Sequence, residues 1–218
     1  MFRKFHFILL GIVSLSFVLQ AQDEQAMAHD IILKTVAKYR DYKTSQIQFI
    51  YILENRMDNI KDEQKGTIFL KQGSFHLVID QQTIISNKVR VWTYMKEVNE
   101  VQISKYCPEE LEINPTELFT MWESGFLYRH IGTAMINNVS THVIELAPHN
   151  KNLSYFKVKL FIDRRNNEIK RIQTFYKNSG IILTFDIISV RANISLSDKL
   201  FMFDPSQYPG ITVVDLTK

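Results

Sequence analysis

The sequence predicts a mainly β protein of the α+β class, in which antiparallel strands follow a single N-terminal helix. Apolar residues recur at helical spacing near the start of the chain, and from Ser45 onward the period changes to two. Short turns such as Lys71-Gln72-Gly73-Ser74 separate the alternating runs, as in β-hairpins. No linker rich in Pro, Gly or Ser interrupts this pattern, so we expect one domain.

The N-terminus has the order of a secretory signal peptide. Positive residues in Met1–Lys4 precede the apolar run Phe5–Leu19, which is shorter than the ~20 residues of a membrane-spanning helix. We expect cleavage after Ala21, which makes residues 1–21 the signal and 22–218 the mature domain. Cleavage after Ala28 and an uncleaved anchor are the alternatives.

Composition restricts the class of partner. Without Arg3 and Lys4, 24 basic residues face 23 acidic ones, a net charge of +1. This balance argues against nucleic acid, which requires clustered Lys and Arg. Cys107 is the single cysteine, so no intrachain disulfide forms and no cysteine at the signal junction carries a lipid. The seven glycines form no phosphate-binding loop, and we expect no cofactor.

The first element of the mature chain is an amphipathic helix. Ala28, Ile31, Ile32, Val36 and Tyr39 lie at helical spacing, with charged residues between them. Strands follow the helix. Period-two alternation begins at Ser45 and returns in Phe75–Ile79 and Phe156–Ile162. Further strand-like runs cover residues 65–71, 83–86, 89–96, 99–105, 127–132, 140–147, 168–177, 181–191 and 199–203.

One segment, residues 107–125, interrupts the strands. Asn114 suits a helix N-cap, Pro115 the first helical position, and Glu117 a capping box. The following Leu118, Phe119, Met121 and Trp122 cover most of the circumference of such a helix. A helix without a polar face must cover an apolar surface, so we expect it to pack as a lid against Trp92 and Tyr94 or their strand neighbours.

The sequence offers no catalytic or metal-binding constellation. The histidines of the mature chain, at positions 29, 76, 130, 142 and 149, lack metal-ligand spacing. Cys107 has no histidine near it in the sequence, and no GxSxG segment occurs. We therefore expect a binding protein rather than an enzyme. The two Trp, nine Tyr and fifteen Phe are compatible with an ordinary core or with a ring-lined cavity.

Several segments, in their order and spacing, resemble the bacterial outer-membrane lipoprotein carrier family, LolA, in its Bacteroidetes-like form. The segments are Tyr39–Thr44, Lys65–Leu70, Ile84–Asn87 with Val91–Tyr94, Glu112–Pro115, Phe201–Pro205 and Gly210–Asp215. The family's Asp-Gly-Lys turn is replaced by Asn87-Lys88-Val89. The arginine that latches the lid in proteobacterial members has no equivalent in Leu70–Gly73, so we assign no latch residue.

The resemblance implies an incomplete antiparallel half-barrel, with an N-terminal helix and short lid helices over a hydrophobic cavity. It implies a monomeric periplasmic chaperone that receives acylated lipoproteins from an inner-membrane ABC transporter and delivers them to an outer-membrane acceptor. A periplasmic sensory domain with the same half-barrel and an enzyme acting on lipid are the alternatives. The residues expected to bind the ligand are Phe49, Leu70, Leu77, Trp92, Tyr94, Leu118, Phe119, Met121, Trp122 and Phe156.

Overall fold

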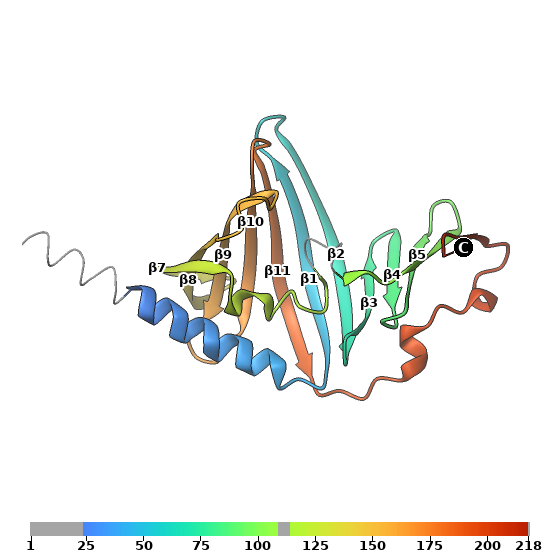
Figure 1. The fold of residues 1–218 in the computed structure, drawn as a ribbon, viewed down its shortest axis with the longest axis horizontal. Coiled ribbons are helices and arrows are strands. Elements are labelled where there is room, and N and C mark those ends of the chain that lie inside the picture. The colour runs from blue at the N-terminus through green and yellow to red at the C-terminus, as the bar shows by residue number, and fades with distance from the viewer. Residues whose placement is uncertain (1–23, 109–113, 218) are drawn as a thin grey trace, which may run out of the picture.

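A computed structural model describes residues 24–108 and 114–217 of the chain. The expected signal peptide and the favoured cleavage site after Ala21 lie outside the described residues, whereas Ala28, the alternative site, lies buried within the helix described next. The described part holds one α-helix, residues 24–40, and a single twelve-stranded sheet (Figure 1). The strands are β1 (Thr44–Asn55), β2 (Ile60–Lys71), β3 (Ser74–Ile79), β4 (Gln82–Ser86), β5 (Arg90–Met95), β6 (Glu100–Lys105), β7 (Phe126–Ile136), β8 (Val139–Pro148), β9 (Tyr155–Asp163), β10 (Ile169–Tyr176), β11 (Ile181–Ala192) and β12 (Thr212–Asp215).

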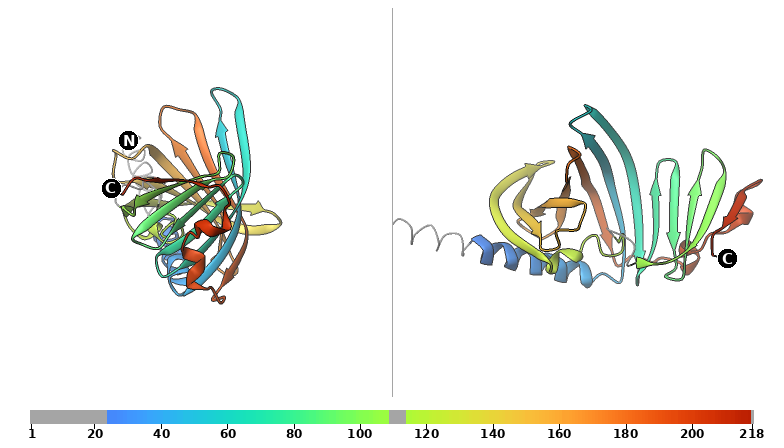
Figure 2. Two further views of the ribbon diagram at one scale, coloured as in Figure 1. Left: turned by 90° about the vertical axis from the view of Figure 1, so that its right-hand side faces the viewer. Right: turned by 45° about the horizontal axis from the view of Figure 1, so that its top comes forward.

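The sheet consists of two antiparallel meanders joined along β1 and β11. Its order is β12-β6-β5-β4-β3-β2-β1-β11-β10-β9-β8-β7, so β7 and β12 form its two edges. All strand pairs are antiparallel except β12 with β6, which is parallel. The sheet twists and curls without closing (Figure 2), and the expected open, mainly β half-barrel is thereby confirmed.

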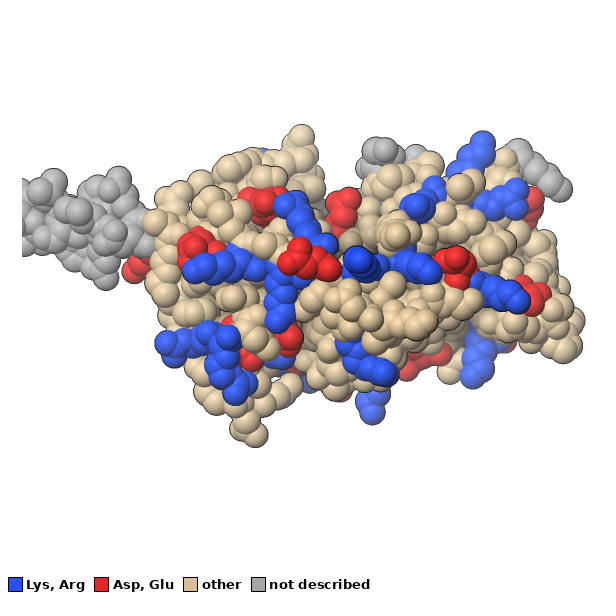
Figure 3. Space-filling view, turned by 90° about the horizontal axis from the view of Figure 1, so that it is seen from below, with Lys and Arg blue, Asp and Glu red and all other residues tan. Residues whose placement is uncertain are grey.

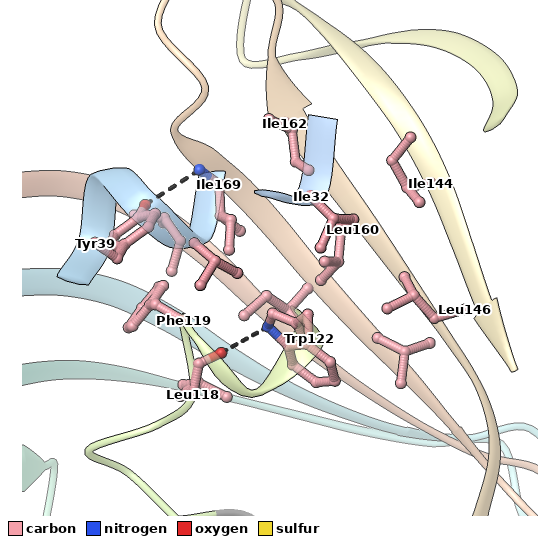
Figure 4. Close-up of a cluster of buried hydrophobic side chains, with 14 of the residues drawn as sticks. Ile32, Tyr39, Leu118, Phe119, Trp122, Ile144, Leu146, Leu160, Ile162 and Ile169 are labelled. Carbon is pink, nitrogen blue, oxygen red and sulfur yellow. Dashed lines mark hydrogen bonds between the residues drawn. The ribbon is translucent and has the colours of Figure 1, made fainter. Parts of the chain in front are cut away.

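The helix of residues 24–40 lies along the curled part of the sheet formed by β7–β11 (Figures 1 and 2). Its expected apolar face, which includes Ile32 and Val36, is buried. Ile144, Leu160 and Ile162 of β8 and β9 belong to the same core cluster (Figure 4). We call this side of the sheet the inner face.

A second, smaller core lies on the opposite, outer face of β3–β6. There Ile85, Trp92 and Val101 pack with Phe203 of the C-terminal segment. This segment, residues 193–211, contains the 3₁₀ turns η3 (Asp198–Phe201) and η4 (Pro205–Gln207), and we call it the C-terminal strap. The His76 Nδ1 lies 2.7 Å from the Leu200 carbonyl oxygen and ties β3 to the strap.

Two expected elements have a different structure. Residues 199–203, expected as a strand, form the end of η3 and an extended connection, because the Ser197 hydroxyl caps the turn by accepting from the Lys199 N–H. Residues 115–120, expected to begin a lid helix, form consecutive turns, and only η2 (Met121–Glu123) is helical. The lid is therefore a turn-rich segment rather than a helix.

Charged side chains of both signs lie together on the face seen from below (Figure 3). Lys34 pairs with Asp30 at 2.6 Å, Lys38 with Glu168 at 3.3 Å, and Lys71 with Asp198 at 2.8 Å. The exposed Lys34–Asp30 pair contributes little to stability, about 0–1 kcal/mol. Within residues 24–108 and 114–217, no helix is long and apolar enough to cross a membrane.

Candidate functional site

An apolar pocket of about 200 Å³ lies on the inner face, where the two meanders of the sheet meet. Its wall is formed by β1, β2, β3 and β11. It is covered by the turn-rich segment of residues 114–123, which we call the roof. Its lining residues are Phe49, Tyr51, Ile68, Leu77, Ile79, Pro115, Leu118, Phe119, Leu183, Phe185 and Ile187. The hydroxyl of Tyr51 is the one polar side-chain group among these residues.

Ring contacts across the junction of β1 and β11 shape the wall. The Phe185 ring centroid lies 5.6 Å from that of Phe49 and 5.4 Å from that of Tyr51, both edge-on. The Phe49 ring also covers Gly66 of β2, directly opposite in the ladder. A Cβ at Gly66 would stand 2.3 Å from Cζ of Phe49, so the ring can occupy this position only over a glycine.

The roof is held by hydrogen bonds within its own segment and by others from Arg40 of the helix and Tyr128 of β7. The Asn114 carboxamide oxygen accepts from the Thr116 N–H at 3.1 Å and starts the turns, the capping role expected of this residue. The Trp122 indole N–H donates to the Leu118 carbonyl at 2.8 Å (Figure 4). Phe119 stacks on Tyr39 of the helix, with 4.9 Å between ring centroids.

The pocket carries no charged side chain among its lining residues. Burial, with a smaller contribution from the Asp62 carboxylate, raises the pKa of the Tyr51 phenol, which therefore stays neutral at physiological pH. A charged ligand group would lose its hydration here without gaining a counter-charge. The pocket is therefore suited to hydrocarbon.

Two further cavities lie elsewhere in the fold, one beside the apolar pocket and one on the outer face. One, of about 200 Å³, shares Phe119 with the apolar pocket and is lined by Lys43, Leu70 and Lys71 among others. The other, of about 630 Å³, lies on the outer face beside the C-terminal strap and includes Lys199 and Asp204. Both have charged groups in their lining, which distinguishes them from the apolar pocket.

The structure brings four of the ten expected site residues together in the apolar pocket: Phe49, Leu77, Leu118 and Phe119. Leu70 lines the neighbouring polar cavity instead. Met121 packs half-buried against the main core, and Trp122 of the same roof segment has 1% of its surface exposed.

Two of the ten expected residues lie on the other face of the sheet from the apolar pocket. Trp92 and Tyr94 lie on the outer face beside the C-terminal strap. Trp92 pairs with Ile85, which points outward, whereas the neighbouring pair of Ile84 and Thr93 points to the inner face. Trp92 and Tyr94 cannot contact the roof segment through the sheet.

Phe156 is the third displaced residue. A bulge in β9 opposite Phe175 and Tyr176 turns it outward, and 49% of its surface is exposed. Its neighbours Tyr155 and Val158 point into the core, so the alternation expected from the sequence shifts by one residue at this point.

The pocket also contains residues that are not among the ten expected ones, chiefly Tyr51, Leu183, Phe185 and Ile187. The last three recur at every second position of β11, so their shared face could be recognised from the sequence. That β11 lies beside β1 could not, since more than a hundred residues separate the paired positions.

Histidines meet at one place outside the pocket. His130 Nε2 and His142 Nδ1 lie 3.1 Å apart across β7 and β8. Burial, followed by the charges of His130 and Arg164, lowers the pKa of His142. In the described ranges, no group of three His, Cys, Asp or Glu side chains is arranged to hold a metal ion.

Comparison with known proteins adds independent findings. The family model "Outer membrane lipoprotein carrier protein LolA" matches residues 40–204. No curated protein matches the sequence. An uncharacterized conserved protein of Thermus thermophilus has a similar fold, with a TM-score of 0.54 at 11% identity, covering 84% of this chain and 96% of that one.

Two further solved structures are similar. LprF of Mycobacterium bovis gives a TM-score of 0.50 at 10% identity, over 79% of this chain and 97% of its own. The LolA superfamily protein NE2245 of Nitrosomonas europaea gives 0.43 at 14% identity, over 81% and 98%. Proteins of the matched family are carriers of the cell envelope, and theirs is a binding fold rather than a catalytic one.

Proposed function

The chain belongs to the LolA family of outer membrane lipoprotein carriers, and from this premise we propose that it is a periplasmic lipoprotein chaperone. In this proposal the apolar pocket takes up the acyl chains of a lipoprotein released from the inner membrane. The protein then carries the lipoprotein to the outer membrane. Residues 1–21 direct its export, and the carrier acts as a monomer.

The uncharged lining of the pocket is the observation that carries this proposal. Each methylene that leaves water for such a surface contributes about 0.8 kcal/mol to binding. Residues from four strands and the roof converge there without a charged group. A sensor or an enzyme acting on a polar headgroup would need polar groups at the same place.

The size of the pocket indicates how uptake would work. Its volume of about 200 Å³ is below the ~300–1,000 Å³ of typical ligand sites. Acyl chains would therefore have to displace Leu118 and Phe119 of the roof. These side chains compete with cargo for the same apolar wall, so binding remains reversible and cargo can be handed on.

The two membrane partners follow from the same scheme. An inner-membrane ABC transporter would supply the acylated lipoprotein, and an outer-membrane acceptor would receive it. Because Leu118 and Phe119 of the roof can cover the apolar wall again when cargo leaves, an acceptor with a deeper apolar site could withdraw the acyl chains without an energy source.

The proposal can be tested with a matched pair of variants in β3. Leu77 lines the pocket, whereas its neighbour Val78 is also half-buried but points to the outer face. Leu77→Gln should lower the amount of acylated polypeptide that native mass spectrometry detects on protein purified from its own periplasm. Val78→Gln should leave this amount unchanged. Equal loss in both variants, or no acylated polypeptide on the wild type, would contradict the proposal.

A further inference from the structure

The outer face of β7–β10 carries an exposed aromatic group surrounded by lysines. Phe156 projects from the bulge in β9, and its ring centroid lies 6.5 Å from that of Phe175 on β10. Lys157 Nζ lies 5.5 Å from the first ring centroid and 4.5 Å from the second. We call Leu127, Phe156, Lys157, Lys159, Phe175 and Lys177 the Phe156 patch.

The remaining members of the patch extend it along the strands. Lys159 Nζ lies 5.8 Å from the Phe175 ring centroid. Lys177 follows Phe175 by two residues and donates to the Lys151 carbonyl. Leu127 on the edge strand β7 is 54% exposed and pairs with Ala147 of β8. Glu145, two residues before Ala147, lies 4.0 Å from Lys157. All of these side chains lie on the face turned away from the helix.

The bulge is what creates the patch. Regular alternation from Val158 would place Phe156 in the core and Tyr155 on the outer face. The extra residue instead directs a large apolar ring into water, where it costs free energy without contributing to the core. The apolar pocket and the two cavities beside the roof and the strap take no lining residue from the patch. Together with Leu127 and Phe175, the exposed ring makes the patch a candidate interaction surface.

The charges of the patch indicate the chemistry of that partner. The patch holds three lysines and no acidic residue. The nearest carboxylate, Glu145, is engaged by Arg129 at 2.9 Å and lies 4.0 Å from Lys157. Lysines that extend around an exposed ring can bind lipid phosphates while the ring enters the acyl boundary. None of the pockets described in the structure is lined by a patch residue, and a surface of this kind suits a fluid bilayer better than a peptide of defined sequence.

We propose that the Phe156 patch docks the protein on anionic lipid bilayers. The patch lies on the opposite face of the sheet from the apolar pocket, so docking leaves the pocket and its roof free. This inference goes beyond the proposed carrier function and does not depend on which cargo the pocket takes.

Vesicle sedimentation tests the proposal. The protein beginning at residue 22, which retains every described residue, is mixed with phosphatidylcholine vesicles that contain or lack phosphatidylglycerol. We expect binding only to the anionic vesicles, and weaker binding at higher salt. Phe156→Ser should lower the partition coefficient by about tenfold. Each lysine-to-glutamine change at positions 157, 159 and 177 should lower it by about fivefold.

Val89→Ser is the matched control. Val89 is an apolar side chain, 69% exposed, in the β4–β5 turn at the other side of the sheet. The variant should bind vesicles as the wild type does. Binding that persists in Phe156→Ser and in the triple lysine variant, or no binding by the wild type, would overturn the proposal. Retention of poly-glutamate without vesicle binding would also overturn it and assign the patch to an acidic protein segment.

The outcome is separable from that of the carrier proposal. Phe156→Ser should retain wild-type uptake of acylated polypeptide, because Phe156 lies on the outer face of the sheet and does not line the pocket. Near-UV circular dichroism should be unchanged, since the ring is half exposed in the native protein. Loss of vesicle binding with intact cargo uptake would support the separate role of the patch.

Discussion

The ring of Phe119 in the roof stacks on the ring of Tyr39 in the helix, with centroids 4.9 Å apart and planes inclined by 20°. The same Phe119 lines the apolar pocket on its other side. Helix, roof and pocket are thus joined through one side chain. Displacement of Phe119 by a ligand would remove the stacking contact as well as a part of the pocket lining.

Phe119→Ala should separate the role of the roof from that of the core. Phe119 is 3% exposed, and its truncation should lower the free energy of unfolding by ~3 kcal/mol. Phe75→Ala is the matched control, since Phe75 is 2% exposed in the same core but does not line the pocket. Urea denaturation should give similar losses for both. Acyl-chain binding should change much more in Phe119→Ala, and equal changes would make Phe119 an ordinary core residue.

Gly66→Ala should distort the pocket from behind its wall. The new methyl group would collide with the buried Phe49 ring, so we expect a loss of ~1–3 kcal/mol in unfolding free energy and weaker acyl binding. A double-mutant cycle with Phe49→Leu supplies the control. The cost of Gly66→Ala should fall when the ring is absent, and strictly additive costs would show that the two residues do not conflict.

Tyr39→Phe should lower the free energy of unfolding by removing one buried hydrogen bond. The Ile169 N–H donates to the Tyr39 hydroxyl at 3.1 Å, and its loss should cost ~1–3 kcal/mol because the N–H stays buried. Tyr42→Phe is the control, because the Tyr42 ring packs beside Tyr39 but is only partly buried. This second variant should cost less, and urea denaturation of the two at neutral pH makes the comparison. Equal losses would mean that the Ile169 N–H finds another partner.

The same tyrosine predicts a dependence on alkaline pH. Burial raises the pKa of the Tyr39 phenol far above its usual value near 10. Unfolded chains ionise at Tyr39 from about pH 10, whereas the folded protein does not, so stability should fall as pH rises above 10. Tyr39→Phe should lose less stability over this range than the wild type. An equal decline in both would mean that Tyr39 ionises in the folded state.

His76 predicts the opposite, acidic dependence. Burial lowers its pKa, opposed in part by the hydrogen bond to the Leu200 carbonyl. Since the unfolded state binds the proton more readily, stability should be complete above about pH 6.5 and should fall as pH decreases below it. His76→Asn keeps a donor near the Nδ1 position without titrating. Thermal unfolding at about pH 7 and pH 5 should show a smaller decrease for the variant, and His142 accounts for part of the remainder.

Period and turn chemistry predicted nearly every strand and the helix, since both signals are local. The helix expected in the roof segment is the exception. Its capping residue Asn114 was recognised correctly, but tertiary contacts of Phe119 and Trp122 favour turns over the helix that the local pattern suggested. Residues 199–203 alternate like a strand because they lie on the sheet, not because they pair within it.

The faces of the strands were harder to predict than the strands themselves. Both faces of β5 are half-buried, so period two alone could not assign Trp92 to the pocket or to the strap. At Phe156 one bulge moves the side chain from the inner to the outer face. The sequence does not reveal this bulge, because apolar residues occur on both faces of β9. Face assignment depends on register, which only the assembled sheet determines.

The junction of β1 with β11 has a consequence for how the protein forms. The strand synthesised first lies in the middle of the sheet and pairs with one that leaves the ribosome more than a hundred residues later. The meander β1–β6 can form early, but its inner edge stays open until β11 arrives. Such distant pairing slows folding. Since Phe49 and Phe185 face each other across this junction, the pocket exists only when nearly the whole chain has been made. Incomplete chains would therefore be unable to hold lipid until β11 has been added.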